Sequence, residues 1–138
     1  MRNEPFHGTW KLNIPASTLP FAAPRSVILK IEVETDRVRL TENTLSAAGI
    51  AETVKIEAKF DDEIHSVVGS GIADGFAIRR VNDLDWETRG FKAGEIVFSA
   101  TLAMSEDRRS FREDGETTLA DGTRARVSLI YERYENEE

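Results

Sequence analysis

The feature that most constrains this chain is a period of two in its apolar residues. In residues 26–34, every second residue from Val27 to Val33 is apolar, and Lys30, Glu32 and Glu34 are among the residues between and after them. Residues 51–60, 95–104 and 124–134 alternate in the same way, and in 95–104 one face holds Ile96, Phe98, Ala100, Leu102 and Met104. Because successive side chains of a β-strand point to opposite faces, each segment is predicted to be a strand with one buried face.

Turn-forming residues separate further segments of this kind along the whole chain. The predicted strands are residues 7–14, 26–34, 37–43, 51–60, 63–68, 75–81, 84–91, 95–104, 109–118 and 124–134. We predict an all-β fold, an antiparallel up-and-down β-barrel of about ten strands in one domain over residues 1–138, because closure removes exposed strand edges. A two-sheet sandwich is the alternative. The best helical candidate, residues 43–52, is interrupted by Gly49 and is predicted to be a short turn.

The two ends of the chain are predicted to meet. In a meander with an even number of strands, the last strand ends beside the start of the first. Trp10 and Arg133 both fall on the inward side of their strands by alternation, and a guanidinium can stack on an indole face. We therefore expect Trp10 and Arg133 to plug one end of the barrel, with Gly8 next to them.

The connection after the first strand has an unusual composition. Residues 14–26 contain Pro15, Pro20 and Pro24, which exclude a stable helix. Since the first strand starts at the plugged end, this connection must lie at the other end. We expect it to act as a lid whose Leu19 and Phe21 reach into the mouth of the barrel.

Composition and charge limit the partners of the protein. The chain carries a net charge of −7 and has a pI near 5.0. An acidic protein does not attract nucleic acid through its overall field, and no apolar run is long enough to span a membrane. The first residues, MRNEPFHG, lack the apolar segment of a signal peptide, so we expect a cytoplasmic protein, with a signal removed before this chain as the alternative.

No residue pattern predicts catalysis, a metal site or a cofactor. The chain has no cysteine, and its two histidines, His7 and His65, show no spacing typical of metal ligands. The Gly69-Ser70-Gly71 segment matches neither a nucleophile elbow nor a phosphate loop. One member of each of the pairs Arg79–Arg80 and Arg108–Arg109 must point inward or sideways, so we expect one buried arginine with a carboxylate partner.

A series of short motifs in a fixed order extends over most of the chain. It comprises GTWKLN (8–13), PRS (24–26), FDDEIHSVVGS (60–70), IRRV (78–81), SED (105–107), ADG (120–122) and YER (131–133). In this the chain resembles a family of small, uncharacterised bacterial lipocalin-like (calycin-type) β-barrel proteins. The resemblance implies a barrel and, by analogy, a hydrophobic cavity; it implies no known activity.

The sequence leaves two main functions open. The first is binding of a small apolar or amphipathic ligand by residues of the cavity and lid, namely Leu19, Phe21, Phe60, Phe76, Trp86, Phe98 and Tyr131. In this hypothesis the Tyr131 hydroxyl orients the ligand. The alternative is a structural or protein-interaction module with a filled core, including a homodimer. An enzyme using interior arginine, tyrosine and carboxylate groups is a third class, for which no catalytic motif is present.

Overall fold

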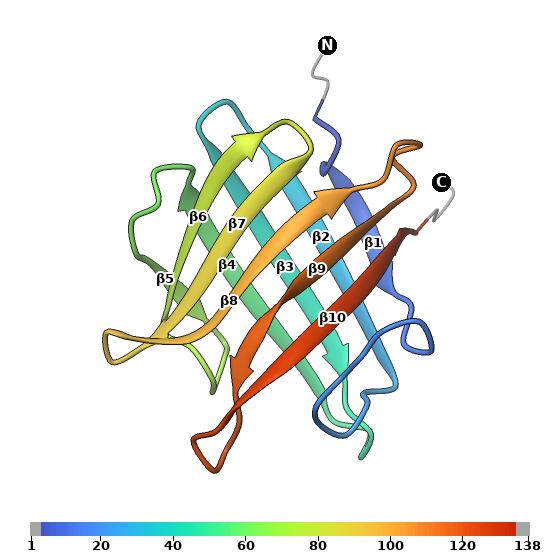
Figure 1. Ribbon diagram of the computed structural model, residues 1–138, viewed down its shortest axis with the longest axis vertical. Coiled ribbons are helices and arrows are strands. Elements are labelled where there is room, and N and C mark those ends of the chain that lie inside the picture. The colour runs from blue at the N-terminus through green and yellow to red at the C-terminus, as the bar shows by residue number, and fades with distance from the viewer. Residues whose placement is uncertain (1–3, 135–138) are drawn as a thin grey trace.

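The computed structural model, which describes residues 4–134, is a closed antiparallel barrel of ten strands (Figure 1). The strands are β1 (Gly8–Leu12), β2 (Ser26–Val33), β3 (Arg37–Leu45), β4 (Ala51–Lys59), β5 (His65–Val68), β6 (Gly75–Asn82), β7 (Asp85–Lys92), β8 (Glu95–Met104), β9 (Ser110–Thr118) and β10 (Arg124–Arg133). Each pairs with its neighbours in sequence, and β1 pairs with β10. The predicted all-β, up-and-down, lipocalin/calycin-like barrel is confirmed. Residues 4–134 include no helix that could cross a membrane.

Arg133 and Trp10 lie opposite each other where β10 meets β1 and seal one end of the barrel. The guanidinium carbon of Arg133 lies 4.2 Å from the centre of the Trp10 ring, as the parity of the two strands predicts. The same guanidinium donates hydrogen bonds to backbone carbonyls that converge on this end, those of Pro5, His7 and Arg108. Backbone carbonyls thus accept hydrogen bonds from the guanidinium of an inward arginine.

An aromatic cluster fills the space beneath this plug. Phe6 is fully buried, and its ring centre lies 4.2 Å from that of Trp86 and 5.4 Å from that of Phe111. Arg80 points to the same end, stacks on Phe60 at 4.3 Å and forms an ion pair of 3.0 Å with Glu4. The expectation that one member of the Arg79–Arg80 pair turns inward toward a carboxylate is confirmed.

The proline-rich connection lies at the opposite end of the barrel from the chain termini (Figure 1). Its first half is attached to β10: the backbone of Thr18 exchanges hydrogen bonds of 2.7 and 3.0 Å with Ser128, and the Ile130 N–H donates to the Ser17 hydroxyl at 3.0 Å. Its second half, residues 19–25, has no assigned secondary structure. The predicted position of this connection, at the end opposite the plug, is therefore correct, and its action as a lid stays a prediction.

Two irregularities interrupt the regular wall. A register shift between β7 and β8 pairs Gly90 with Phe98 but Phe91 with Ile96, so the strict alternation fails at the start of β8. Ile96 is 37% exposed, and its predicted place on the inner face is wrong. β5 is the weakest part of the wall, because it joins each neighbour through only two residue pairs.

Gly8 is required by the plug. Its φ of +143° lies in a region that side chains rarely adopt, and a Cβ there would lie 2.6 Å from Nη1 of Arg133. Any larger residue would strain the backbone and displace the guanidinium from its position over Trp10. The glycine two residues before the tryptophan thus leaves room for the arginine of the last strand.

We expect Gly8→Ala to lower the free energy of unfolding by about 2 kcal/mol or more, because it adds backbone strain and displaces Arg133. Urea denaturation measures this. Gly71→Ala is the control, since a Cβ there has no neighbour within 4 Å and its φ is not positive. Equal effects of the two substitutions would contradict the role given to Gly8.

Candidate functional site

The barrel encloses a cavity of about 260 Å³, lined mainly by apolar side chains from the inner faces of the strands. Toward the lid it meets a second, more open cavity of about 590 Å³, bounded by the proline-rich connection and by the β3–β4 and β5–β6 turns. The two share six lining residues, which are Phe21, Glu42, Val54, Ser70, Ile72 and Tyr131. They form one continuous site, and we call the 260 Å³ part the inner cavity and the 590 Å³ part the mouth.

Most of the predicted cavity residues surround this site. The inner cavity is lined by Phe76, Trp86, Phe98 and Tyr131, and the mouth by Leu19, with Phe21 in both. Phe60 is the exception: it packs at the plugged end, edge-on to Trp86 at 5.1 Å, and does not line either part. Its predicted place in the cavity is wrong, because Phe60 belongs to the aromatic cluster that fills the plugged end of the barrel.

The ring of Phe98 lies close against the barrel wall because the residue opposite it on the neighbouring strand is a glycine. The ring covers Gly90 of the neighbouring strand, where a Cβ would lie only 2.0 Å from a ring carbon. The glycine therefore gives the ring a recess in the barrel wall. The space in front of the ring stays free, which helps to keep the inner cavity open.

Two glutamates occupy inward positions that the strand pattern would otherwise fill with apolar residues. Glu42 of β3 pairs with Leu29 and Val54 on the adjacent strands. Glu113 of β9 pairs with Leu102 and Leu129. Both line the inner cavity, and Glu42 lines the mouth as well. Their remaining accessible surface faces the enclosed site, so the carboxyls are surrounded by protein although neither residue is fully buried.

The environment of these carboxyls opposes their ionisation. Burial, then repulsion from Glu42 and Asp114, raises the pKa of Glu113 to about 7 from an ordinary value of 4.5. Burial, then repulsion from Glu52, also raises the pKa of Glu42. Burial and the charges of the two inward glutamates raise the pKa of Tyr131 well above 10.0. Near neutral pH the site therefore holds negative charge at a cost in stability.

Several polar groups of the site have no hydrogen-bond or ion-pair partner among the described residues. Among residues 4–134, no hydrogen bond or ion pair joins the carboxyls of Glu42 and Glu113 or the hydroxyl of Tyr131 to another group. Within the same residues, Trp86 Nε1 and Thr88 Oγ1 are buried and likewise without a hydrogen-bond partner. Buried polar groups are nearly always paired, so this concentration of unpaired groups is typical of a binding site.

The site contains acidic but no basic side chains. Of the described residues that line its two parts, none is Lys, Arg or His, whereas Glu42, Glu52 and Glu113 are acidic. The inward arginines, Arg80 and Arg133, lie at the plugged end. The charge of the glutamates is thus not neutralised within the cavity.

The histidines do not contribute to this site. The imidazole Nδ1 of His7 accepts a hydrogen bond from the Val33 N–H at 3.0 Å, and His65 Nε2 lies 3.0 Å from Asp61. No group of three or more His, Cys, Asp or Glu suited to a metal ion occurs in residues 4–134.

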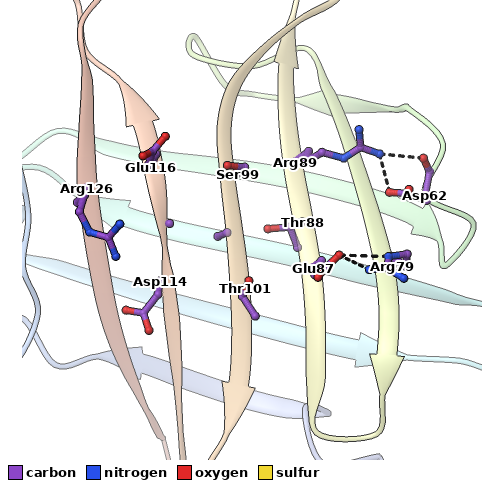
Figure 2. A pocket seen from close by; sticks show the side chains of 12 residues that line it. Asp62, Arg79, Glu87, Thr88, Arg89, Ser99, Thr101, Asp114, Glu116 and Arg126 are labelled. Carbon is purple, nitrogen blue, oxygen red and sulfur yellow. Dashed lines mark hydrogen bonds and ion pairs between the residues drawn. The ribbon is translucent and has the colours of Figure 1, made fainter.

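A second, charged depression lies on the outer face of β6–β10 (Figure 2). Here opposite charges are already paired: Arg89 contacts Asp62 at 2.6 Å, and Arg79 donates to Glu87 at 3.1 Å. Arg126 lies across from Glu116 on the adjacent strand. Exposed pairs of this kind are common and stabilise little, so we assign no binding role to this face.

The sequence contained a signal for Glu42 and Glu113 that the search for known motifs missed. Glu42 follows Val38 and Leu40 at inward spacing in β3, and Glu113 follows Phe111 in β9. A carboxylate that replaces an apolar residue at such a position must either lie near a strand end or face a cavity. Testing each predicted strand for such replacements would have found both.

We expect Glu113→Gln to stabilise the protein above pH 7 and to leave its stability nearly unchanged at pH 4.5 or below. The folded-state pKa is above the ordinary value, so the folded protein holds the proton more tightly, and stability is lost as the pH rises from 4.5 to about 7. The rise in the pKa of Glu113 corresponds to a loss of up to about 3 kcal/mol in the free energy of unfolding.

Urea denaturation between pH 4.5 and pH 8 measures the difference between variant and wild type. The control is Glu116→Gln, on the outer face of the same strand, where the side chain is 47% exposed beside Arg124. If the Glu113→Gln difference does not grow with pH, Glu113 is not a buried acid.

Comparison with models of protein families and with curated protein sequences found no match. The topology shows the closed antiparallel barrel of ten strands, which is consistent with a lipocalin/calycin-like architecture. The family resemblance carried by the GTWKLN and YER motifs stays a prediction.

Proposed function

We propose that this protein binds a small amphipathic molecule inside its barrel. The observation that carries the proposal is the enclosed, mainly apolar cavity of about 260 Å³ with a few unpaired polar groups and an opening at one end. Sites of this composition are typical of small-molecule binding: the apolar wall provides affinity and the few polar groups fix the orientation of the ligand.

The mouth gives such a ligand a route of entry. Phe21 of the lid and Ile72 of the β5–β6 turn line both the mouth and the inner cavity, yet they are 53% and 66% exposed. Exposed apolar side chains at the rim of an apolar cavity favour the capture of an apolar chain from water. The plug at the other end makes the mouth the expected entrance and exit.

The alternative function, a filled-core interaction module, also stays a prediction. A filled core would leave no room for a probe molecule, and the interaction surface would lie outside the barrel. The space beside Phe98 and the two inward carboxyls favours the binding proposal over this alternative.

We expect the neutral dye Nile red to bind in the cavity and to gain fluorescence as it leaves water. Val54→Phe should weaken this binding at least about fivefold, because Val54 lines both parts of the site and a larger side chain fills the space. The matched control is Lys55→Phe, which places the same residue on the adjacent, exposed position of β4.

Equal binding by the two variants would place the dye outside the cavity. Absence of binding of both Nile red and ten-carbon amphiphiles to the wild-type protein would contradict the proposed function and favour the interaction module.

A further inference from the structure

We propose that the cavity selects ligands that carry a protonated amine on an apolar chain. The inference rests on the proposed function and names the chemistry of the ligand. Its basis is the position of two carboxyls, Glu42 on β3 and Glu113 on β9, in one enclosed site whose other walls are apolar.

The geometry of the site leaves the carboxyls available to a ligand. No side chain of residues 4–134 donates a hydrogen bond to either, and none of the described lining residues is basic. A cation that enters therefore meets no competing positive charge. A carboxylate or phosphate ligand would instead be repelled by Glu42, Glu113 and, at the mouth, Glu52.

The cost of keeping ionised carboxylates in a poorly solvated site favours a ligand with an amine over a ligand with a neutral polar group. Ionised carboxylates in a poorly solvated site are unstable until a cation or a set of donors pairs with them. An alkylammonium group offers three donors and stays charged up to about pH 10, as the lysine side chain does. Its hydrogen bonds to a carboxylate add the attraction between two opposite charges, which a neutral alcohol donor lacks.

A second, independent observation also indicates a ligand with polar groups. The indole N–H of Trp86 can only donate, and it is buried and unpaired among the described residues, as is the hydroxyl of Thr88. Both residues line the inner cavity that holds the carboxyls. A purely apolar ligand would leave all these groups unsatisfied, whereas an ammonium can donate to the Thr88 hydroxyl. The Trp86 N–H cannot pair with an ammonium, which has no acceptor, and would need an acceptor elsewhere on the amphipathic ligand.

The preference for an amine should depend on pH. The titratable groups that face Glu113 are Glu42 from β3 and Tyr131 from β10, while the inner face of β8 is apolar and Asp114 points outward. Protonation of Glu113 below pH 7 removes one of the charges that hold the amine. Affinity for an amine should therefore fall between pH 8 and pH 5.5, while affinity for an alcohol of equal length should not.

The test is displacement of Nile red by three ten-carbon ligands, decylamine, 1-decanol and decanoate, at pH 8. We expect wild-type protein to bind decylamine at least about tenfold more tightly than 1-decanol, and decanoate most weakly. In the double variant Glu42→Gln/Glu113→Gln the amine and the alcohol should bind with nearly equal affinity, and decanoate should gain.

The matched control is Glu95→Gln/Glu106→Gln, which removes two exposed carboxylates and changes the net charge by the same amount. It should keep the amine preference, which separates the cavity carboxyls from the general attraction of an acidic protein for cations. Glutamine is close in shape to glutamate and removes buried charge, so the double cavity variant should fold; a thermal melt checks this, and the single variants serve if it does not.

Binding of all three ligands with similar affinity, or an amine preference that persists in Glu42→Gln/Glu113→Gln, would overturn the inference while leaving the proposed function intact. Failure of both the dye and all three ligands to bind would instead reject the proposed function itself.

Discussion

The stacking of Arg133 on Trp10 determines which end of the barrel is closed and which is open. It occurs where the last strand pairs with the first, so the contact that closes the sheet also closes one end of the barrel. The carbonyls that receive the guanidinium come from the segment before β1 and from the β8–β9 turn, which draws these segments over the same end. In the part of the chain that the structure describes, aromatic rings fill the closed half, and the cavity opens toward the proline-rich connection.

The parity of side chains explains how much of the fold could be predicted from the sequence. Alternation placed all ten strands, and a meander with an even number of strands brought Trp10 to Arg133. It failed at Ile96, because a bulge changes the register of β8 against β7 and no residue near it announces the shift. It failed differently at Phe60, whose inward direction was correct but whose depth in the barrel depends on the stagger of the strands.

The sequence predicted the aromatic residues of the candidate site but not its two glutamates. Aromatic residues at inward positions indicate a core or a cavity, and only packed volumes distinguish the two. Phe76 and Phe98 prove to face open space, since the recess at Gly90 takes the Phe98 ring out of the centre. The two glutamates were absent from the predicted site because motif-based reasoning looks for known spacings, whereas their significance lies in which wall of the barrel each one faces.

The buried carboxyls also illustrate a conflict between stability and function. A leucine at position 42 or 113 would continue the apolar face of its strand and would not lower the free energy of unfolding. Under the proposed function, a chain that keeps acids at both positions accepts a less stable folded state, and binding of an amine would offset that cost. On this view the empty barrel is the strained form and the occupied barrel the relaxed one.

The attachment of the lid to β10 has a mechanical consequence. Hydrogen bonds between Thr18 and Ser128 make the first half of the connection an additional short edge of the sheet, which moves with the barrel. The other end of the connection is fixed as well, because the Arg25 N–H donates to the Leu45 carbonyl at 2.8 Å, so any movement would be confined to residues 19–24. Two prolines, Pro20 and Pro24, stiffen that stretch, so it should turn as a short rigid arm carrying Phe21 rather than fold away residue by residue.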